Sequence, residues 1–521
     1  MISGMRIAID FGSTHTVAAA AAADGTIAPL FLPRLSLPGT FQIPSVISFA
    51  DPDAPLVGYP VERSGLLTAP GTFRWMKRYI ALNSPVRVRA GSERIPAKEA
   101  AVRFLRRTLN EIETAVAPET VSELVFTAPT DSFDFYRDWL KRSFEAPNLA
   151  VRVLDETGAA AADAGIRLES GEPFFVLDVG GTTQQALAAA RDSNGTIHVK
   201  GKDGRSVGGA DIDRWILEEL CARIGIPLQD ARLRPQGTAL LRGCERLKIA
   251  LSEREAARFE PEDDPGGLTF GGTELTREEL ETILRRHDFL SALERMVRDV
   301  RNAAAANGVD TAAFRRLFMI GGSVRIPAVR AAVRAVFPES SFVETDPTTS
   351  VAVGALRAGT FGLTPLRDIL THSYAVRYRD GQSGEARFET IVPSGAIFPS
   401  TGIVKTLRLK ATRPNQRLFG LAIYERSLTP DAGASDPFEL LFDENGEIRI
   451  LNRIQPSEAF ESIFLNARAA QFLEADPPAS RDETRFSVDF AIDADRFLIV
   501  SAFDLRNGRT VLDRRPVVRL S

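Results

Sequence analysis

A short glycine turn occurs twice in this chain of 521 residues, each time directly after an apolar, strand-like run. The first is Asp10-Phe-Gly-Ser-Thr14 and the second is Asp178-Val-Gly-Gly-Thr-Thr183, so their leading aspartates lie 168 positions apart (178 − 10). One glycine turn after a strand is common and predicts only a reversal of the chain. Two such turns, each after an apolar strand, predict two copies of one lobe that face each other.

The residues of each turn suit a phosphate group. Glycines let the backbone approach a phosphate closely, and successive N–H groups and Ser or Thr hydroxyls donate hydrogen bonds to its oxygens. The carboxylate that heads each turn, Asp10 or Asp178, suits a hydrated divalent cation, usually Mg2+, that bridges the phosphates. The two turns therefore predict a nucleotide clamped between the lobes.

Composition narrows the class of protein. Hydrophobic residues make up 44% of the chain and charged residues 25%, as in ordinary folded proteins, and the length predicts two to four domains. A net charge of −4 offers no basic face, so we expect no nucleic-acid partner. Without an apolar stretch of roughly twenty residues or a signal peptide, we expect no membrane association and a cytoplasmic location. Cys221 and Cys244 are predicted to be buried small hydrophobic residues.

The pattern of apolar residues changes once along the chain. Up to about residue 360, strand-like runs alternate with amphipathic helices, which predicts α/β layers. The expected helices are Lys98–Val116, Asp211–Ile224, Gly237–Ser252 and a long Thr276–Ala306 that starts with a capping box, and the expected buried strands are Glu123–Ala128, Phe174–Asp178 and Leu317–Ile320. After about residue 371, short alternating runs separated by turn residues predict an all-β sandwich of about 150 residues.

A third glycine turn, Gly321-Gly-Ser-Val-Arg-Ile-Pro327, follows the strand at Leu317. With it, nearly the whole chain resembles the seventy-kilodalton heat-shock chaperone family of the DnaK type. Further matching motifs are Ile43-Pro-Ser-Val-Ile47, Val207-Gly-Gly-Ala-Asp211, Phe490-Ala-Ile-Asp-Ala-Asp495 and Leu498-Ile-Val-Ser-Ala502. Each motif is modest alone, but all of them in order are highly specific.

The resemblance implies a division into domains and a function. Residues 1–362 would form a two-lobed, actin-like ATPase domain, residues 363–371 a linker, and residues 372–521 a β-sandwich that binds peptides. The implied activity is slow ATP hydrolysis coupled to binding of unfolded or extended polypeptide, with J-domain co-chaperones and nucleotide-exchange factors as partners. Typical members continue into a helical lid; here the sequence ends at Ser521, so we expect a lidless member that exchanges peptide faster.

The resemblance also assigns catalytic roles. Lys77 would position the attacking water and the γ-phosphate, because a compact ammonium suits the charge that develops there. Glu156 would orient water and magnesium, Asp10 and Asp178 would hold Mg2+ through water, and the Thr183 hydroxyl would donate to phosphate. Without the resemblance, the sequence around Lys77 predicts a surface residue of a helix. Glu156 would then be a negative charge placed favourably at a helix N-terminus.

The resemblance assigns nucleotide-binding residues and interdomain coupling residues in the same way. The implied nucleotide-binding set is Gly12, Ser13, Thr14, Gly180, Gly181, Thr182, Gly208, Gly209, Glu245, Lys248, Ser252, Gly321, Gly322, Ser323 and Arg325. Arg325 would stack on adenine, which suits a planar guanidinium. Pro129, Arg137 and the linker residue Asp368 match the family's interdomain coupling positions; the alternatives for the first two are a strand terminator and a solvated helix arginine.

Five positions depart from the family pattern. Ile249 replaces a second adenine-stacking arginine, which predicts weaker ATP affinity or relaxed base selectivity. Thr182 replaces a glycine and adds a side chain near the phosphates, and Gln185 replaces an aspartate associated with potassium, so K+ is a doubtful cofactor. Ala210 and Thr348 replace acidic residues, which alters cation affinity. We therefore expect turnover that is slow rather than absent.

Two alternative functions remain. The first is a nucleotide-sensing interaction module that binds ATP or ADP and hardly hydrolyses it; the changes at positions 182, 185, 210 and 249 favour it, and retention of Lys77 opposes it. The second is a small-molecule kinase of the same superfamily, which the C-terminal β region opposes.

The resemblance also implies a peptide-binding groove in the β region. Val376 lies near the strand that forms this groove, and Arg377 and Arg379 would make the groove more polar.

Overall fold

The structure is a computed structural model. It describes residues 4–81, 84–130, 132, 134–165, 168–228, 230–260, 270, 272–343, 348–358, 366–379, 385–426, 438–442, 448–452, 462–466, 471–493 and 496–520. The chain divides into two compact units, Met1–Leu366 with Asp431–Arg453, and Arg367–Pro430 with Ile454–Ser521. The hairpin of β24 (Phe438–Phe442) and β25 (Ile448–Asn452), which the sequence analysis placed in the sandwich, groups with the first unit, and β25 lies beside η2 (Ala231–Gln236).

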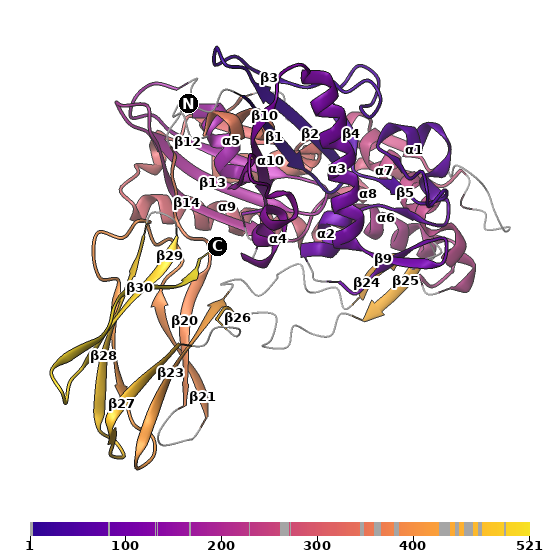
Figure 1. Ribbon diagram of the computed structural model, residues 1–521. Coiled ribbons are helices and arrows are strands. Elements are labelled where there is room, and N and C mark those ends of the chain that lie inside the picture. Colours follow the sequence, from indigo (N-terminus) through magenta and orange to yellow (C-terminus); the bar gives the residue numbers. More distant parts are fainter. Residues whose placement is uncertain are drawn as a thin grey trace. The chain divides into compact units, whose positions relative to one another are not determined.

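Two large sheets of the first unit share one topology (Figure 1). The first runs β11-β10-β1-β2-β3, and the second runs β18-β17-β12-β13-β14. Their strands are β1 (Met5–Phe11), β2 (His15–Ala21), β3 (Ile27–Pro29), β10 (Val121–Ala128) and β11 (Ala150–Asp155), and β12 (Pro173–Val179), β13 (Gln184–Arg191), β14 (Ile197–Arg205), β17 (Arg316–Ile320) and β18 (Ser341–Val343). In both sheets, the strand before the glycine turn is antiparallel to the strand after it and parallel to a later strand. The predicted internal repeat is therefore confirmed.

Two helices connect the sheets. Helix α5 (Glu156–Gly165) packs on β12 and β13, helix α11 (Ser350–Arg357) packs on β1 and β2, and the two helices pack on each other. Their backbones come so close that a Cβ on Gly354 would lie 1.9 Å from the carbonyl oxygen of Ala159. The alanine-rich sequence of α5 and this glycine permit the approach, because small residues let helix axes come together.

Three of the four predicted helices are confirmed as α3 (Ala97–Val116), α6 (Gly209–Arg223) and α7 (Gly237–Glu253). The fourth prediction is wrong, because the segment forms two helices, α8 (Arg277–Arg286) and α9 (Phe289–Ala306). The His287 ring stacks on Trp215 with centroids 4.5 Å apart, and Asp288 takes a left-handed conformation with φ of 55°, which aspartate tolerates. The predicted capping box is present, since the N–H of Glu279 donates to Thr276 Oγ1 at 3.2 Å.

The remaining elements of the first unit are short or peripheral. They are α1 (Tyr59–Arg63), η1 (Leu66–Thr68), α2 (Met76–Ala81), α4 (Asp134–Phe144), η3 (Thr311–Ala313), η4 (Gly322–Arg325), α10 (Pro327–Val336), and strands β4 (Gln42–Pro44), β5 (Ile47–Ser48), β6 (Leu56–Val57), β7 (Thr72–Phe73), β8 (Arg87–Ala90), β9 (Glu93–Pro96), β15 (Ala256–Arg258) and β16 (Glu274–Thr276), with β19 (Leu366–Arg367) at the boundary of the units. Cys221 and Cys244 are free and buried, as predicted. Within the described ranges, no helix combines the length and apolar character needed to cross a membrane.

The second unit is built of antiparallel strands around one core, as the alternating pattern predicted. One sheet runs β21-β20-β23-β26, with β27 also paired to β23, and the other runs β22-β28-β29-β30. The strands are β20 (Ser373–Arg379), β21 (Ala386–Val392), β22 (Lys405–Lys410), β23 (Gln416–Arg426), β26 (Ser462–Phe464), β27 (Gln471–Ala479), β28 (Thr484–Ile492), β29 (Phe497–Asp504) and β30 (Arg509–Arg519). Residues such as Leu421 and Ile423 of one sheet and Phe486 and Val488 of the other share a hydrophobic core.

An ion pair links α2 to α6 within the first unit. The Arg78 guanidinium donates to both oxygens of Asp211, at 2.9 and 3.2 Å, and Asp211 also accepts the backbone N–H of Gly208 at 2.9 Å. Burial favours the neutral acid, but Arg78, together with Arg214 and the Gly208 N–H, outweighs burial and holds the pKa of Asp211 below its usual value. Asp211 is therefore a buried charge that depends on Arg78.

Replacing Arg78 by Met should make stability depend on pH. In the wild type, the folded pKa of Asp211 lies below the unfolded value, so its contribution is present at neutral pH and is lost only in acid. In the variant, burial without the guanidinium raises the folded pKa above the unfolded value, so stability falls as pH rises from about 4 towards 7. We expect a loss of about 3 kcal/mol at pH 8 and a smaller loss at pH 5.

Urea denaturation of both proteins at the two pH values measures this effect. The three tryptophans all lie in the first unit, so their fluorescence reports its unfolding. Arg232→Met is the control, since the exposed Arg232 pairs with Asp230 at the surface and its removal should cost less than about 1 kcal/mol. An Arg78→Met deficit that is equal at pH 5 and pH 8 would contradict the electrostatic account.

Candidate functional site

All three glycine turns line one cavity of about 380 Å³ in the first unit. The predicted catalytic residues Asp10, Lys77, Glu156, Asp178 and Thr183 all line it. So do the predicted nucleotide-binding residues Gly12, Ser13, Thr14, Gly180, Gly181, Thr182, Gly209, Glu245, Lys248, Ser252, Gly321, Gly322, Ser323 and Arg325. Residues from 10 to 325 along the chain are thus brought to one place by the two related sheets.

The first and second glycine turns touch each other. Ser13 Oγ and Thr182 Oγ1 are 2.6 Å apart, and a Cβ on Gly181 would lie 2.8 Å from the Thr14 hydroxyl. The third turn is equally tight, because Gly321 has φ of 81° and a Cβ there would lie 2.4 Å from Asp178 Oδ1. Thr182, which the sequence analysis noted as an added side chain near the phosphates, directs its hydroxyl to the opposite turn.

Lys77 and Glu156 form a buried ion pair in the cavity wall. Lys77 lies on α2 and Glu156 begins α5, and Lys77 Nζ donates a hydrogen bond to Glu156 Oε1. Burial alone would favour the neutral amine, but the Glu156 carboxylate reverses this and raises the pKa of Lys77. The charged ammonium is therefore favoured, although only 6% of the side chain is exposed.

Asp10 and Asp178 add two further carboxyl groups to the cavity. Asp10 accepts a hydrogen bond from the Thr127 hydroxyl at 2.7 Å, a residue that the sequence analysis did not single out. Burial and the neighbouring Glu156 raise the pKa of Asp10 to about 6 and that of Asp178 to about 8. Ionising all three carboxyl groups beside one ammonium is therefore unfavourable, and a divalent cation would favour their ionised forms.

The donor set fits magnesium better than a transition metal. No group of three or more His, Cys, Asp or Glu residues arranged to hold a metal occurs in the described part of the chain. Magnesium keeps several waters and takes only one or two carboxylates together with substrate phosphates. Asp10 and Asp178, at the heads of the two glycine turns, would supply those carboxylates.

The other end of the cavity is formed by α7. Lys248 Nζ donates to the carbonyl oxygen of Gly209 at 2.9 Å and lies 2.7 Å from Asp213 Oδ1. Ser252 donates to the Lys248 carbonyl oxygen at 3.1 Å, and Glu245 lies 3.6 Å from Arg74. The sequence analysis missed Asp213, which also lines the cavity; its place in the run that follows the Gly208-Gly209 motif was the available signal.

Residues that depart from the family pattern also lie in this region. Ile249, Ala210 and Thr348 line the cavity, and the Ile249 side chain is 55% exposed, so an apolar group stands where a second arginine was expected. Gln185 lies just behind the wall, where its Nε2 donates to Glu156 Oε2 at 2.6 Å.

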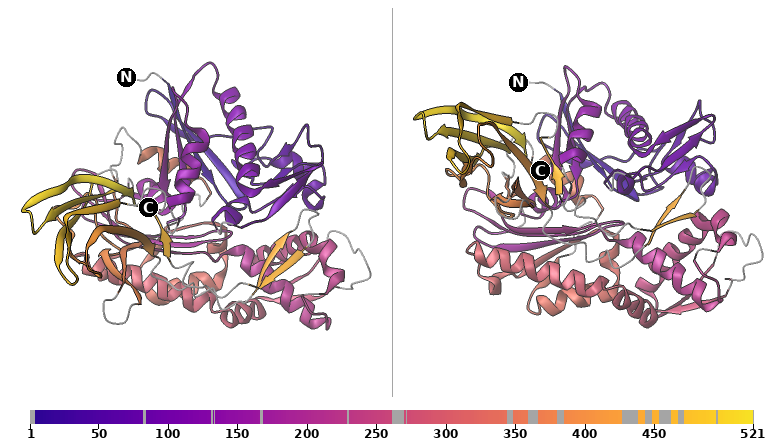
Figure 2. Two further views of the ribbon diagram at one scale, coloured as in Figure 1. Left: turned by 60° about the horizontal axis from the view of Figure 1, so that its bottom comes forward. Right: turned by 90° about the horizontal axis from the view of Figure 1, so that it is seen from below.

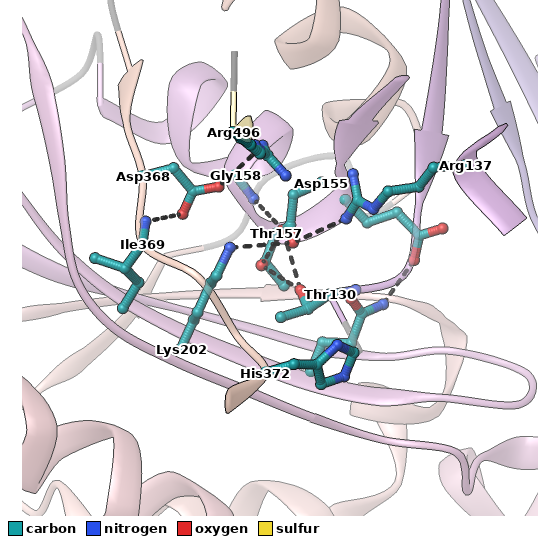
Figure 3. Close-up of polar contacts among 12 residues, drawn as sticks. Thr130, Arg137, Asp155, Thr157, Gly158, Lys202, Asp368, Ile369, His372 and Arg496 are labelled. Carbon is teal, nitrogen blue, oxygen red and sulfur yellow. Dashed lines mark hydrogen bonds and ion pairs between the residues drawn. The ribbon is translucent and has the colours of Figure 1, made fainter. Parts of the chain in front are cut away.

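Four predicted residues lie outside the cavity lining. Gly208 packs behind the second turn, where a Cβ would lie 2.6 Å from the Thr182 nitrogen. Pro129 follows β10, and Arg137 lies on α4 with its guanidinium 3.8 Å from Asp155. Asp368 belongs to the second unit, where its Oδ1 accepts the N–H of Ile369 at 2.7 Å and its Oδ2 lies 3.8 Å from Arg496 (Figure 3).

Comparison with known proteins shows the family of this chain. The profile of the Hsp70 protein family matches residues 7–401. The chaperone protein DnaK of Thermotoga petrophila is 26% identical to this chain over 96% of the chain and 79% of its own length, and that of Thermotoga maritima gives the same values. DnaK of Thermotoga neapolitana is 25% identical over the same shares. The family profile covers most of the sequence, including all three glycine turns, and this chain therefore belongs to the Hsp70 family.

Proposed function

We propose that this Hsp70-family chaperone binds ATP with Mg2+ in the cavity of its first unit and hydrolyses it slowly. On this proposal, the two related sheets are the lobes of an actin-like ATPase domain. The observation that carries the proposal is the buried Lys77–Glu156 pair, which lines the same cavity as both phosphate-type glycine turns. A buried ion pair is weak as a source of stability, so its position in the cavity favours a catalytic role.

The glycine turns would hold the phosphates. Their backbone N–H groups and the hydroxyls of Ser13, Thr14 and Thr183 are donors at the cavity surface. Asp10 and Asp178 would hold the magnesium ion, which supplies charge neutralisation to the phosphates when bound. Arg325, which also lines the cavity, would contact adenine.

Lys77 and Glu156 would act at the terminal phosphate. The permanently charged ammonium of Lys77 stabilises negative charge on the phosphoryl group as it is transferred, and burial strengthens that interaction. Glu156 fixes the ammonium through its Oε1 and is available to orient a water molecule. Phosphoryl transfer depends mainly on such positioning and electrostatics, so these two side chains, with the turns and the magnesium ion, would support slow hydrolysis.

A nucleotide-sensing module with little hydrolysis is the second candidate. It is favoured by the contact between Ser13 and Thr182, because hydroxyls that bond to each other across the two turns at 2.6 Å must separate before both can donate to phosphate. On this alternative, nucleotide would change the conformation of the turns without turnover. The Lys77 variant described below separates the two candidates.

The second unit carries a surface suited to an extended polypeptide. Tyr424 of β23 stacks on Phe464 with ring centroids 4.9 Å apart and meets Phe388 edge-on at 5.2 Å. The Arg377 guanidinium donates to the Tyr424 hydroxyl at 3.3 Å, and Arg426 lies over Phe388 at 4.9 Å. We call these five residues the aromatic face; they alternate with the core-facing residues of the sheet β21-β20-β23-β26.

The aromatic face combines apolar rings with two arginines. Rings of this kind bind apolar side chains of an extended chain, and arginine side chains select for acidic residues beside them. We propose that it binds apolar polypeptide segments flanked by acidic residues, and that nucleotide in the first unit changes its affinity. Coupling of this kind is reciprocal, so nucleotide and polypeptide must change each other's binding by the same factor.

Lys77→Met should abolish hydrolysis and spare nucleotide binding. The variant keeps the length of the side chain and removes the charge that the transferred phosphoryl group needs. We expect the single-turnover rate of ATP hydrolysis to fall by about 100-fold or more. The dissociation constant for ADP, measured by isothermal titration calorimetry, should change by less than about tenfold.

Lys141→Met is the matched control, because Lys141 lies on the surface of α4 and pairs only with Glu145 among the described ion pairs. Its rate should equal that of the wild type. Hydrolysis by the wild type that is no faster than by Lys77→Met, with ADP binding retained by both, would favour the nucleotide-sensing module instead.

Tyr424→Ala should weaken polypeptide binding. Tyr424 lies at the centre of the aromatic face, and removing it separates Phe388 from Phe464. With a fluorescein-labelled peptide that has leucines between glutamates, we expect affinity to fall by about tenfold or more in fluorescence anisotropy. Phe503→Ala is the control, since Phe503 is an exposed aromatic residue of the other sheet. Equal effects of the two substitutions would argue against the aromatic face.

A further inference from the structure

Gln185 makes two short hydrogen bonds in opposite directions. It lies on β13 with no exposed surface, and its Oε1 accepts the backbone N–H of Thr130 at 2.6 Å. Its Nε2 donates to Glu156 Oε2 at 2.6 Å. A backbone N–H can only donate and a carboxylate accepts, so these partners fix which end of the amide faces which group.

Both oxygens of Glu156 are thereby held. Lys77 donates to Oε1 and Gln185 donates to Oε2, so the plane of the carboxylate is set by two partners from different elements. Gln185 Nε2 also lies 3.4 Å from the Thr183 hydroxyl, at the end of the second glycine turn. A group that must orient water depends on this kind of support, because small errors in orientation reduce rates strongly.

Thr130 is held a second time through its side chain. Its hydroxyl donates to Asp155 Oδ1 at 3.0 Å, which also accepts the Thr157 hydroxyl at 2.7 Å and the Gly158 N–H at 3.0 Å (Figure 3). Lys202 lies 3.5 Å from the other carboxylate oxygen of Asp155. The buried Asp155 is therefore surrounded by donors and positive charge.

The contacts form a closed ring. Glu156 bonds to Gln185, Gln185 to the backbone of Thr130, the Thr130 hydroxyl to Asp155, and Asp155 precedes Glu156 in the chain. The segment that directly follows Pro129 is consequently tied to two adjacent carboxylates, one of which lines the cavity. A change in the orientation of Glu156 must be accompanied by a change at Thr130 or by a broken hydrogen bond.

We propose that Gln185 is a positioning residue that orients Glu156 for hydrolysis and links it mechanically to the backbone at Thr130. The inference rests on the proposed ATPase function for its effect on rate. The neutral amide is suited to both tasks, because it donates to the carboxylate and accepts from the N–H without adding charge. A carboxylate at position 185 would face Glu156 with a like charge and would need a proton or a cation between the two groups.

Three variants test the two hydrogen bonds separately. Gln185→Met keeps the length of the side chain and removes both bonds. Gln185→Glu keeps an acceptor for the Thr130 N–H and, in its ionised form, removes the donor to Glu156. Gln184→Met is the matched control, because Gln184 is the neighbouring residue of β13, is equally buried, and has no hydrogen-bond partner for its amide atoms within the described structure.

The measurements are the single-turnover rate of ATP hydrolysis, the affinity for ADP, and the hydrogen-exchange rate of the Thr130 amide. For Gln185→Met, we expect the rate to fall by about 10- to 100-fold, ADP affinity to change by less than about threefold, and exchange at Thr130 to accelerate by about tenfold or more. For Gln185→Glu, hydrolysis should fall as far, whereas Thr130 should stay protected. The wild-type rate should be equal in K+ and Na+ buffers of the same ionic strength, and Gln184→Met should match the wild type throughout.

The outcomes separate this inference from the proposed function. If the wild type shows no Lys77-dependent hydrolysis, the ATPase proposal fails, and exchange at Thr130 alone decides whether Gln185 provides the link. Unchanged Thr130 exchange in Gln185→Met would overturn the link. A rate unchanged in both Gln185 variants would overturn the positioning role, and a parallel loss of ADP affinity would show a general structural defect instead.

Discussion

Direct contact between the two glycine turns is the constraint on which the first unit depends. Ser13 and Thr182 belong to different sheets and are 169 residues apart in sequence, yet their hydroxyl oxygens lie within hydrogen-bond distance. That contact requires the sheets to present their turns at matching positions, which the shared strand order achieves. It also requires α5 and α11 to pack closely, which the small residues at Ala159 and Gly354 allow. Figure 2 shows the two sheets with the helices around them.

Charge within the cavity follows from the same constraint. When the turns meet, Asp10 and Asp178 approach Glu156, and burial raises the pKa of both aspartates. Lys77 offsets only part of this charge. The protein thus buries an excess of carboxyl groups whose ionisation is unfavourable, an arrangement typical of sites prepared for a cation and phosphates. Arg78 on the same helix as Lys77 pairs with Asp211, which ties α2 to α6 beside the site.

Much of this arrangement could be predicted from the sequence. The two turns were visible because glycine, hydroxyl and carboxylate residues recur in one order after apolar strands. Helix α3 was visible because it buries one face with a helical period, and strands such as β10 were visible as short apolar runs that are buried on both faces. The break at His287 and Asp288 was not visible, because apolar periodicity continues through it, and the contact of His287 with the distant Trp215 leaves no local signal. The local pattern of apolar residues does not predict contacts between residues that are distant in sequence.

Some site residues could not be predicted from the sequence, because their contacts are also with residues distant in sequence. Asp213 and Thr127 act through partners that are distant in sequence, Lys248 and Asp10 respectively. At position 185, the sequence indicated only the loss of an expected aspartate, whereas the structure reveals the gain of two hydrogen bonds. A substitution that looks like a defect by comparison can therefore be an alternative solution, and only the geometry distinguishes the two.

The central claim is that the glycine turns form a phosphate site. Isothermal titration of the wild-type protein with adenosine and with Mg2+–ADP tests it most directly, since the two ligands share the base and sugar and differ in the phosphates. If the turns bind phosphate, ADP should bind at least about 100-fold more tightly than adenosine, as expected when several charge-assisted hydrogen bonds are added. Equal affinities, or no binding of ADP, would contradict the account.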